Sequence, residues 1–271
     1  MVNILKRLIA KLLRKSNEER EWDSRIQDVL SCPDNQFIPR AAEAGHLKSK
    51  FQVMHNGLKV RKDGYYGKGI TRMLAKNKGV HEPQEERVFQ EVLKLLPPES
   101  TMIELGAYWS FYSMWFLDQI SGGKTFLFEP DARNLAIGKL NFEANRFNGD
   151  FTNAYIGDLL DLAAQPPTLT VDYIVEHKKI GFIDVLHCDI QSHELDMLKG
   201  ATGCIEKDLI RYFFISTHSN ELHRSCLSFL VKYNYIIVCE ADLFNSYSFD
   251  GLIVARSPNH NGIPAVGIAH K

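Results

Sequence analysis

Short apolar segments alternate with helical ones over most of the chain from residue 101 onward, and this alternation limits the fold more than any other feature of the sequence. Apolar runs separated by amphipathic stretches are typical of strands that alternate with helices, and such chains form a mostly parallel sheet covered by helices on both faces. Strands are predicted at residues 102–105, 125–128, 151–155, 183–188, 212–216, 236–239 and 251–255, and helices at 111–120, 132–146, 193–199 and 222–232.

The chain before residue 101 predicts a separate extension. Residues 51–64 indicate two short strands around the pair Asn56-Gly57, a dipeptide that favours β-hairpin turns. Residues 82–96 predict an amphipathic helix that ends at a pair of prolines. We therefore expect three parts, namely a helical and hairpin extension over 1–80, a sheet domain over 81–257 and a tail over 258–271.

The first fifteen residues form a basic amphipathic pattern. Leucine and isoleucine recur at helical spacing between Met1 and Lys15, and lysine and arginine occupy the opposite face. The segment is too short to span a bilayer, and its charges interrupt it too often for a secretory signal. Two alternatives stay open. The helix packs on the protein or on a second subunit of a homo-oligomer, or it lies on an anionic membrane surface as a peripheral anchor.

Bulk composition disfavours several function classes. The formal net charge is −1, so no overall basic field favours nucleic acid as a partner. The five cysteines are scattered and odd in number, without a Cys-x-x-Cys pair. This usage favours reduced thiols in a cytoplasmic protein over a disulfide framework or a zinc site made of cysteines.

A turn with small residues follows the first predicted strand of the sheet. The strand ends near Glu104, and Gly106-Ala107 would let a ligand approach the backbone where a helix begins. Twenty-five positions after Glu104, the next strand ends at Glu129, where a carboxylate can accept hydrogen bonds from both ribose hydroxyls of a nucleoside. The single glycine disfavours a pyrophosphate cradle. S-adenosylmethionine has no phosphates, and its cationic sulfonium would favour Glu104 nearby.

Four segments in fixed order resemble the FkbM family of S-adenosylmethionine-dependent methyltransferases. They are Glu104-Leu-Gly-Ala-Tyr-Trp-Ser-Phe-Tyr-Ser, Phe128-Glu-Pro, His187-Cys-Asp-Ile-Gln-Ser-His-Glu-Leu-Asp-Met-Leu-Lys-Gly200 and Asp250-Gly-Leu-Ile. The resemblance implies an α/β, Rossmann-like class I methyltransferase fold with a mostly parallel seven-stranded sheet. It also implies methyl transfer to a hydroxyl of a sugar, glycan or glycosylated natural product.

The resemblance also implies where the cofactor lies. The predicted cofactor-binding residues are Glu104, Gly106, Ala107, Tyr108, Ser110, Glu129, Pro130 and Asp158. The first three would border the methionine part of S-adenosylmethionine, Glu129 would bind its ribose, and Asp158 would lie near the adenine amino group.

The chain departs from the family pattern at three places. Ser110 stands where the family has a second glycine, Tyr108-Trp109 are bulkier than the family's usual residues, and Gln191-Ser192 replace its Glu-Gly pair, which removes a negative charge. These departures support an alternative in which the chain is a catalytically degenerate scaffold that binds a partner or a lipid surface. A nicotinamide-dependent oxidoreductase is a second alternative, which the missing phosphate glycines disfavour.

Polar residues follow two later strands, at the edge where open α/β sheets bind their ligands. Asp189, His193 and Glu194 follow the fourth strand, and His218 follows the fifth. His218 is the predicted general base that would take the proton of an acceptor hydroxyl, with Asp189 and His193 as further catalytic residues. Asp189, His218 and Glu194 are also a predicted ligand set for Mg²⁺ or Mn²⁺, which would make that hydroxyl more acidic. The alternative roles are structural, as acids at a helix start.

Aromatic residues near the predicted site have two interpretations. Tyr65, Tyr66, Trp109, Tyr112 and Trp115 could form a rim against which a sugar packs. Aromatic residues at helical spacing are also typical of a core, which is the location we expect for Trp115.

Overall fold

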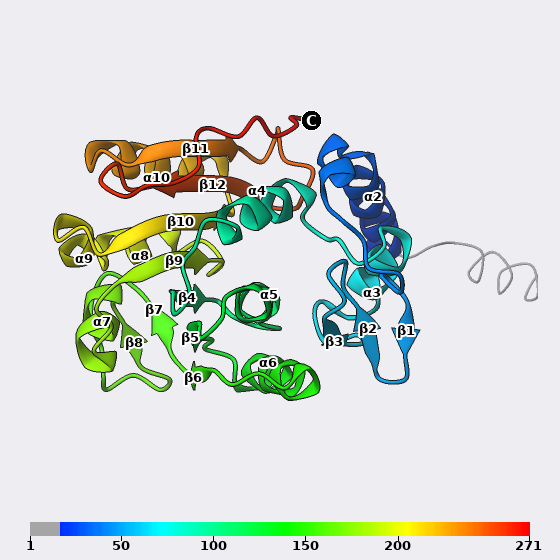
Figure 1. Ribbon diagram of the computed structural model, residues 1–271, viewed down its shortest axis with the longest axis horizontal. Helices are drawn as coiled ribbons and strands as arrows, with labels where there is room; N and C mark the ends of the chain where they lie inside the picture. The colour runs from blue at the N-terminus through cyan, green and yellow to red at the C-terminus, as the bar shows by residue number, and fades with distance from the viewer. Residues whose placement is uncertain (1–16) are drawn as a thin grey trace, which may run out of the picture.

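The computed structural model describes residues 17–271, so the basic helix expected at the start of the chain lies outside the described residues. A seven-stranded sheet has the order β11-β12-β10-β9-β4-β5-β6 (Figure 1). Its strands are β4 (Thr101–Leu105), β5 (Lys124–Phe128), β6 (Asp150–Thr152), β9 (Ile183–Cys188), β10 (Ile210–Thr217), β11 (Ile236–Ala241) and β12 (Gly251–Arg256). Only β12 runs antiparallel to its neighbours within this sheet. The predicted mostly parallel seven-stranded sheet is confirmed.

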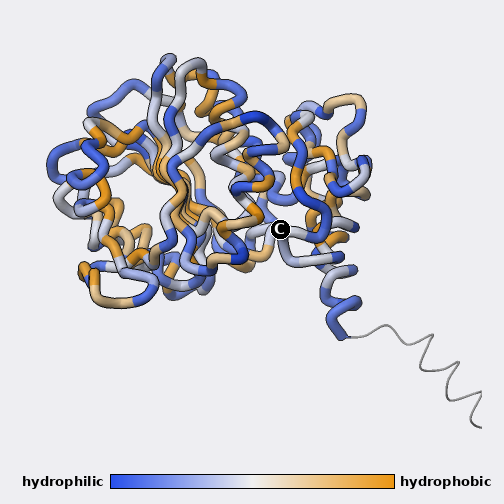
Figure 2. Tube along the Cα trace, turned by 90° about the horizontal axis from the view of Figure 1, so that it is seen from below, coloured by the Kyte–Doolittle hydropathy of each residue, from blue (hydrophilic) through white to orange (hydrophobic). Residues whose placement is uncertain are grey.

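Helices pack on both faces of this sheet, because most residues of its central strands are apolar on each face. On one face, Met102 of β4 belongs to a core with α4 (Pro83–Leu93), α5 (Phe111–Gln119) and α6 (Ala132–Asn145). On the other face, Ile103 belongs to a core with α7 (Val171–Lys178), α8 (Glu194–Lys199), α9 (Thr202–Glu206) and α10 (Asn220–Lys232). Hydrophobic segments accordingly gather in the strands at the centre of the molecule (Figure 2).

One predicted strand, 151–155, divides into two pieces. β6 ends at Thr152, and β7 (Tyr155–Ile156) pairs with β8 (Thr168–Leu169) outside the main sheet. Between them the Asn153 side chain donates to the backbone carbonyls of Glu129 and Pro130, each at 2.8 Å. These bonds tie the chain to the end of β5. A side-chain bond of this kind does not appear in hydrophobic periodicity, so the sequence did not predict the break.

The described part of the extension before the sheet, residues 17–80, contains two α-helices, a 3₁₀ helix and a small sheet. Its elements are α2 (Asn17–Ser31), the 3₁₀ helix η1 (Pro33–Phe37), β1 (Leu47–Lys48), β2 (Phe51–Val53), β3 (Lys59–Arg61) and α3 (Gly67–Lys76). β2 and β3 form the predicted hairpin, in which Gly57 has a left-handed φ of +95°. β1 adds a strand that the sequence did not predict. None of the helices in residues 17–271 has the length and apolarity needed to cross a membrane.

The extension is attached to the main sheet through α6 and lies beside it in Figure 1. The Asn141 side chain accepts a hydrogen bond of 2.7 Å from the amide of Arg61. Asn145 accepts from the amide of Lys59 and donates back to its carbonyl, at 2.9 and 2.7 Å. Two asparagines on α6 therefore bind the outer edge of β3. This contact places α2 and α3 next to the carboxyl edge of the parallel strands, where two cavities lie.

Candidate active site

The smaller of the two cavities, of about 520 Å³, lies at the ends of β4, β5 and β9. Among the predicted cofactor and catalytic residues, those that line it are Gly106, Tyr108, Glu129, Pro130, Asp189 and His193. They come from three separate turns that follow parallel strands. This is the position at which an open α/β sheet binds a nucleoside.

Glu129 is held rigidly in the wall of the smaller cavity. One carboxylate oxygen accepts a hydrogen bond of 2.9 Å from the amide of Asp131, and the other accepts one of 3.2 Å from the amide of Tyr108. Burial raises the pKa of this carboxyl above its ordinary value. Each oxygen has a further lone pair. The side chain of Asn134, which also lines the cavity, contributes a further hydrogen bond to this carboxylate. The acceptor capacity that remains faces a ligand in the cavity, as binding of a ribose hydroxyl requires.

The structure requires glycine at position 106 for a reason other than the ligand approach that the sequence indicated. Its φ is +77°, and a Cβ atom there would lie 1.7 Å from the backbone oxygen of Asp189. The turn after β4 and the end of β9 thus approach each other too closely for any side chain. The glycine lets the two strand ends close one side of the cavity, and ligand approach is a secondary consequence.

Four predicted cofactor residues do not line the smaller cavity. Glu104 is buried, accepts a hydrogen bond of 3.1 Å from the amide of Ser113, and so caps α5. Burial raises the pKa of Glu104 to about 7. Ala107 is buried. Ser110 turns its hydroxyl toward α6, since a Cβ on Gly138 would lie 2.4 Å from it.

Asp158, the fourth, is exposed in the loop after β7. Its neighbours Ala154, Tyr155 and Ile156 line the cavity in its place. The main-sheet strand β6 ends at Thr152, so the residues that directly follow the break, and not Asp158, reach the cavity. Asp158 therefore lies outside this cavity, and residues 154–156 line it.

His218 lies at the end of β10 among three carboxylates. Its Nδ1 is 2.9 Å from Glu194 Oε1, and its Nε2 is 3.2 Å from Asp189 Oδ1 and 3.5 Å from Asp250 Oδ1. Burial by itself lowers the pKa of His218, but its interactions with Asp189 and Glu194 outweigh burial and raise the pKa to about 10. His218 is therefore protonated at neutral pH, and it is better suited to carry charge than to accept a proton as the predicted base.

The predicted metal-ligand set is not formed. Asp189 and Glu194 contact opposite nitrogens of the His218 ring, so no single ion can touch all three residues. Glu194 Oε1 also accepts from the amides of Ile190 and Ser192, each at 3.2 Å, which closes the turn before α8. Within residues 17–271, no group of three or more histidine, cysteine or acidic side chains is arranged to hold a metal ion.

His193 lies apart from His218. Its side chain is 65% exposed and pairs with Asp196 at 3.3 Å, on the rim of the smaller cavity. The two histidines that the sequence grouped together therefore have different surroundings, because His193 directly precedes α8 on the surface and His218 follows β10 at the sheet edge.

The larger cavity, of about 630 Å³, extends from the sheet edge to α2 and α3. Tyr65, Tyr66 and Gln191 line both cavities and so form their shared wall. Of the five predicted aromatic rim residues, only these two tyrosines line the cavities. Trp109, Tyr112 and Trp115 are buried in the core, as expected for Trp115, and Tyr65 stacks on Trp109 with ring centroids 4.3 Å apart.

The larger cavity also contains residues to which the sequence gave no role. The most informative are Trp22, Arg25, Glu82, Phe249 and Asp250. They come from α2, from the residue before α4 and from the loop before β12, which are far apart in the chain. Asp250 could have been found, because it begins the Asp-Gly-Leu-Ile motif of an antiparallel strand that starts at the carboxyl edge.

Asp250 lies next to His218 because Gly251 of β12 pairs with Thr217 of β10. Burial raises the pKa of Asp250 to about 7, and the negative charge of Asp189 adds to this effect. Apart from the 3.5 Å contact with His218, the carboxylate has no hydrogen-bond or ion-pair partner among the described residues. Its remaining lone pairs are available to a ligand.

Two of three comparisons with known proteins found similar proteins. A family model of the methyltransferase FkbM domain matches residues 101–237. Among curated sequences, none matches the chain. A candidate S-adenosylmethionine-dependent methyltransferase from Streptococcus mutans is similar in structure with a TM-score of 0.50 and 11% identity, over 78% of this chain and 57% of that one.

Two further structures are similar at lower scores. Precorrin-6y C5,15-methyltransferase from Geobacter metallireducens has a TM-score of 0.44 and 10% identity, over 64% of this chain and 87% of its own. TrmK of M. capricolum, in complex with S-adenosylhomocysteine, has a TM-score of 0.43 and 13% identity, over 64% of this chain and 69% of its own. The family match covers half of this chain and, with the fold, supports a methyltransferase that uses S-adenosylmethionine. The chain belongs to the FkbM methyltransferase family.

Proposed function

We propose that the protein transfers the methyl group of S-adenosylmethionine to a hydroxyl group of a sugar, glycan or glycosylated natural product. The observation that carries this proposal is the meeting of the two cavities at Tyr65, Tyr66 and Gln191, beside the contact between Asp189 and His218. A donor in one cavity and an acceptor in the other would meet at that wall. Such placement lowers the barrier to a bimolecular reaction.

The smaller cavity fits the cofactor in volume and in chemistry. Its volume of about 520 Å³ lies within the range of roughly 300–1,000 Å³ that is usual for small-molecule sites. Glu129 would bind the ribose hydroxyls, and Asp189 would place a negative charge near the sulfonium. When bound, S-adenosylmethionine supplies an electrophilic methyl group.

Asp250 is the proposed proton acceptor of the reaction. The hydroxyl proton of the acceptor moves to the Asp250 carboxylate, and an electron pair of the hydroxyl oxygen forms the new C–O bond. The electron pair of the broken C–S bond stays on sulfur, so the products are a methyl ether and S-adenosylhomocysteine. The protonated His218 keeps Asp189 and Asp250 close together by reducing their mutual repulsion.

The larger cavity has the chemistry that a sugar needs. The aromatic rings of Trp22 and Phe249 line the cavity, and the Arg25 guanidinium lies over both of them. Together they offer a sugar both apolar ring surface and hydrogen-bond donors. Carboxylates such as Glu82 and Asp250 accept hydrogen bonds from hydroxyls. This mixture supports a polyhydroxyl acceptor, in agreement with what the family resemblance implies.

The test has two parts that separate this function from its alternatives. Calorimetry on the full-length protein should detect micromolar binding of S-adenosylmethionine and S-adenosylhomocysteine, and no binding of NAD. Incubation with S-adenosylmethionine and a set of methyl hexopyranosides should then give a product heavier by one methylene unit in mass spectrometry. Binding without methylation of any acceptor would favour the degenerate scaffold. Binding of NAD in place of the sulfonium nucleoside would favour the oxidoreductase.

A further inference from the structure

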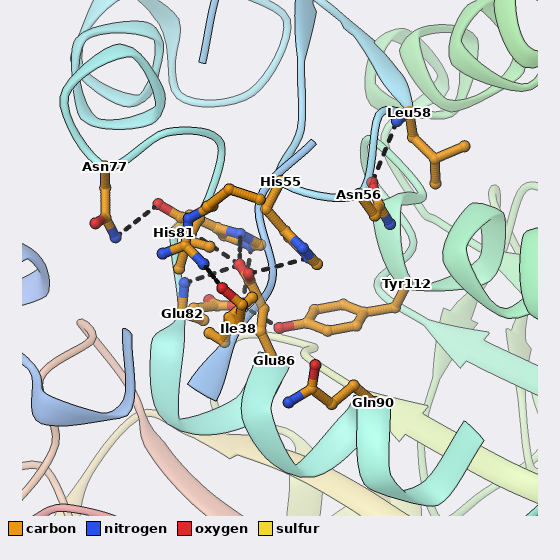
Figure 3. A network of polar contacts seen from close by, with 12 residues as sticks. Ile38, His55, Asn56, Leu58, Asn77, His81, Glu82, Glu86, Gln90 and Tyr112 are labelled. Carbon is orange, nitrogen blue, oxygen red and sulfur yellow. Dashed lines mark hydrogen bonds and ion pairs between the residues drawn. The ribbon is translucent and has the colours of Figure 1, made fainter. Parts of the chain in front are cut away.

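Glu82 forms part of the wall of the larger cavity, and its two carboxylate oxygens have different surroundings. The residue directly precedes α4, yet its side chain makes no capping hydrogen bond to that helix. Oε2 accepts a hydrogen bond of 2.8 Å from the Tyr112 hydroxyl and lies 3.0 Å from Nε2 of His81 (Figure 3). Nothing in residues 17–271 donates to Oε1, and the side chain keeps 16% of its exposure. Oε1 is therefore the oxygen that a ligand can reach.

A row of buried charged groups beneath the cavity keeps Glu82 ionised. Glu86 of α4 lies 2.6 Å from Nδ1 of His81 and 3.3 Å from Nε2 of His55, as Figure 3 shows. Burial by itself lowers the pKa of His81, but Glu82 and Glu86 outweigh it and raise that pKa to about 10. Burial likewise raises the pKa of Glu82, but the charge of His81 outweighs it and holds this pKa below its ordinary value. Glu82 thus presents a fixed negative charge.

Stability alone is a weak explanation for this network. Apolar residues of similar volume often stabilise a core as well as buried ion pairs do, because removing charges from water is costly. The network nevertheless ends at a cavity wall, with one carboxylate oxygen held and the other left for a ligand. An arrangement of this kind orients a carboxylate toward a bound molecule.

We propose that Glu82 is a specificity-determining residue, whose Oε1 accepts a hydrogen bond from an acceptor hydroxyl other than the one that is methylated. This inference rests on the proposed function, because it needs a polyhydroxyl ligand in the larger cavity. Asp250 lines the same cavity from the sheet edge, so one ligand would meet the two carboxylates with different hydroxyls. A hydrogen bond between a hydroxyl and a charged carboxylate corresponds to about ten- to hundredfold in affinity.

The experiment compares methyl hexopyranosides with their monodeoxy analogues. Dissociation constants are measured by NMR titration of the full-length protein with S-adenosylhomocysteine present. For the parent glycoside that binds best, we expect the wild type to bind one deoxy analogue about ten- to hundredfold more weakly. Glu82→Gln should bind the parent and that analogue with dissociation constants within about threefold of each other. The variant lacks the negative charge that, in the wild type, strengthens the hydrogen bond from the hydroxyl found only in the parent.

Two further variants separate ligand binding from a structural effect. Tyr112→Phe removes the hydrogen bond that holds Oε2 and leaves the charge of Glu82. It should therefore weaken the parent glycoside more than the deoxy analogue and lower their ratio, by less than Glu82→Gln does. Glu91→Gln, on the exposed side of α4, should behave as the wild type. A Glu82→Gln protein that still discriminates against the same deoxy analogue overturns the inference and leaves the proposed function intact. A wild type that binds no glycoside at all overturns the sugar assignment first, and the role of Glu82 with it.

Discussion

The two cavities differ in how the chain builds them. The smaller cavity is lined mainly by turns that directly follow β4, β5 and β9, so its residues belong to continuous motifs of the sheet. The larger cavity combines α2, the segment before α4 and the loop before β12. A cavity made from strand ends keeps its geometry with the sheet, whereas one made from distant segments can change with the extension. The first suits a common cofactor, and the second suits a particular acceptor.

Asp250 gives the sharpest test of the difference between the two cavities, because its substitution should reduce methyl transfer and leave cofactor binding in the smaller cavity unchanged. Asp250→Asn keeps the shape of the side chain and removes the base, so turnover should fall by about 10²–10⁴-fold. The dissociation constant of S-adenosylmethionine should stay the same in calorimetry. Turnover of the wild type should rise with pH through about 7, because Asp250 must lose its proton before it can accept another.

The exposed acid Glu221 at the start of α10 provides the control for Asp250. Glu221→Gln should keep the activity and pH profile of the wild type. An Asp250→Asn protein with full turnover would remove Asp250 from the chemistry. The proton would then need another acceptor at the junction of the cavities.

Glu129 tests the smaller cavity in the same way. Glu129→Ala removes both acceptors for the ribose, so binding of S-adenosylmethionine should weaken by about 1–3 kcal/mol in calorimetry. Sugar binding in the larger cavity should be unaffected. Asp158→Ala is a matched control, since Asp158 lies outside the cavity. Equal losses in the two variants would mean that the ribose site has been misplaced.

Phe249 tests the aromatic wall of the larger cavity with a smaller expected effect. Phe249→Ala removes an exposed ring on which a sugar can pack, so the acceptor KM should rise by roughly three- to tenfold, about 0.5–1.5 kcal/mol. Phe244→Ala, in the same loop but outside the cavity, should leave KM unchanged. If both variants change KM alike, the loop acts through its conformation and not through the Phe249 ring.

Chelation should have the smallest effect of all. The Asp189, His218 and Glu194 side chains do not converge on one point. No metal is then needed to activate the hydroxyl, so turnover in excess EDTA should stay within about twofold of the untreated enzyme. Turnover is measured after dialysis against the chelator. A loss that added Mg²⁺ or Mn²⁺ restores would bring back the metal-dependent mechanism at this edge.

Much of the main sheet was predictable, because its strands are buried on both faces and read as apolar runs. Residues 183–188 were predicted with the bounds that β9 has. The break between β6 and β7 was not predictable, because it depends on the Asn153 side chain and two distant carbonyls. After that break, residues 154–156 line the smaller cavity and Asp158 does not.

The sequence by itself determined the sheet, the family and the grouping of Gly106, Glu129 and Asp189 at one edge, because these depend on periodicity and on residues at fixed distances from strand ends. Only the tertiary structure decided which residues form the larger cavity, because α2, Glu82 and Asp250 meet through contacts between distant segments. It also decided the charge of His218, since a histidine takes its pKa from the carboxylates that the fold brings around it.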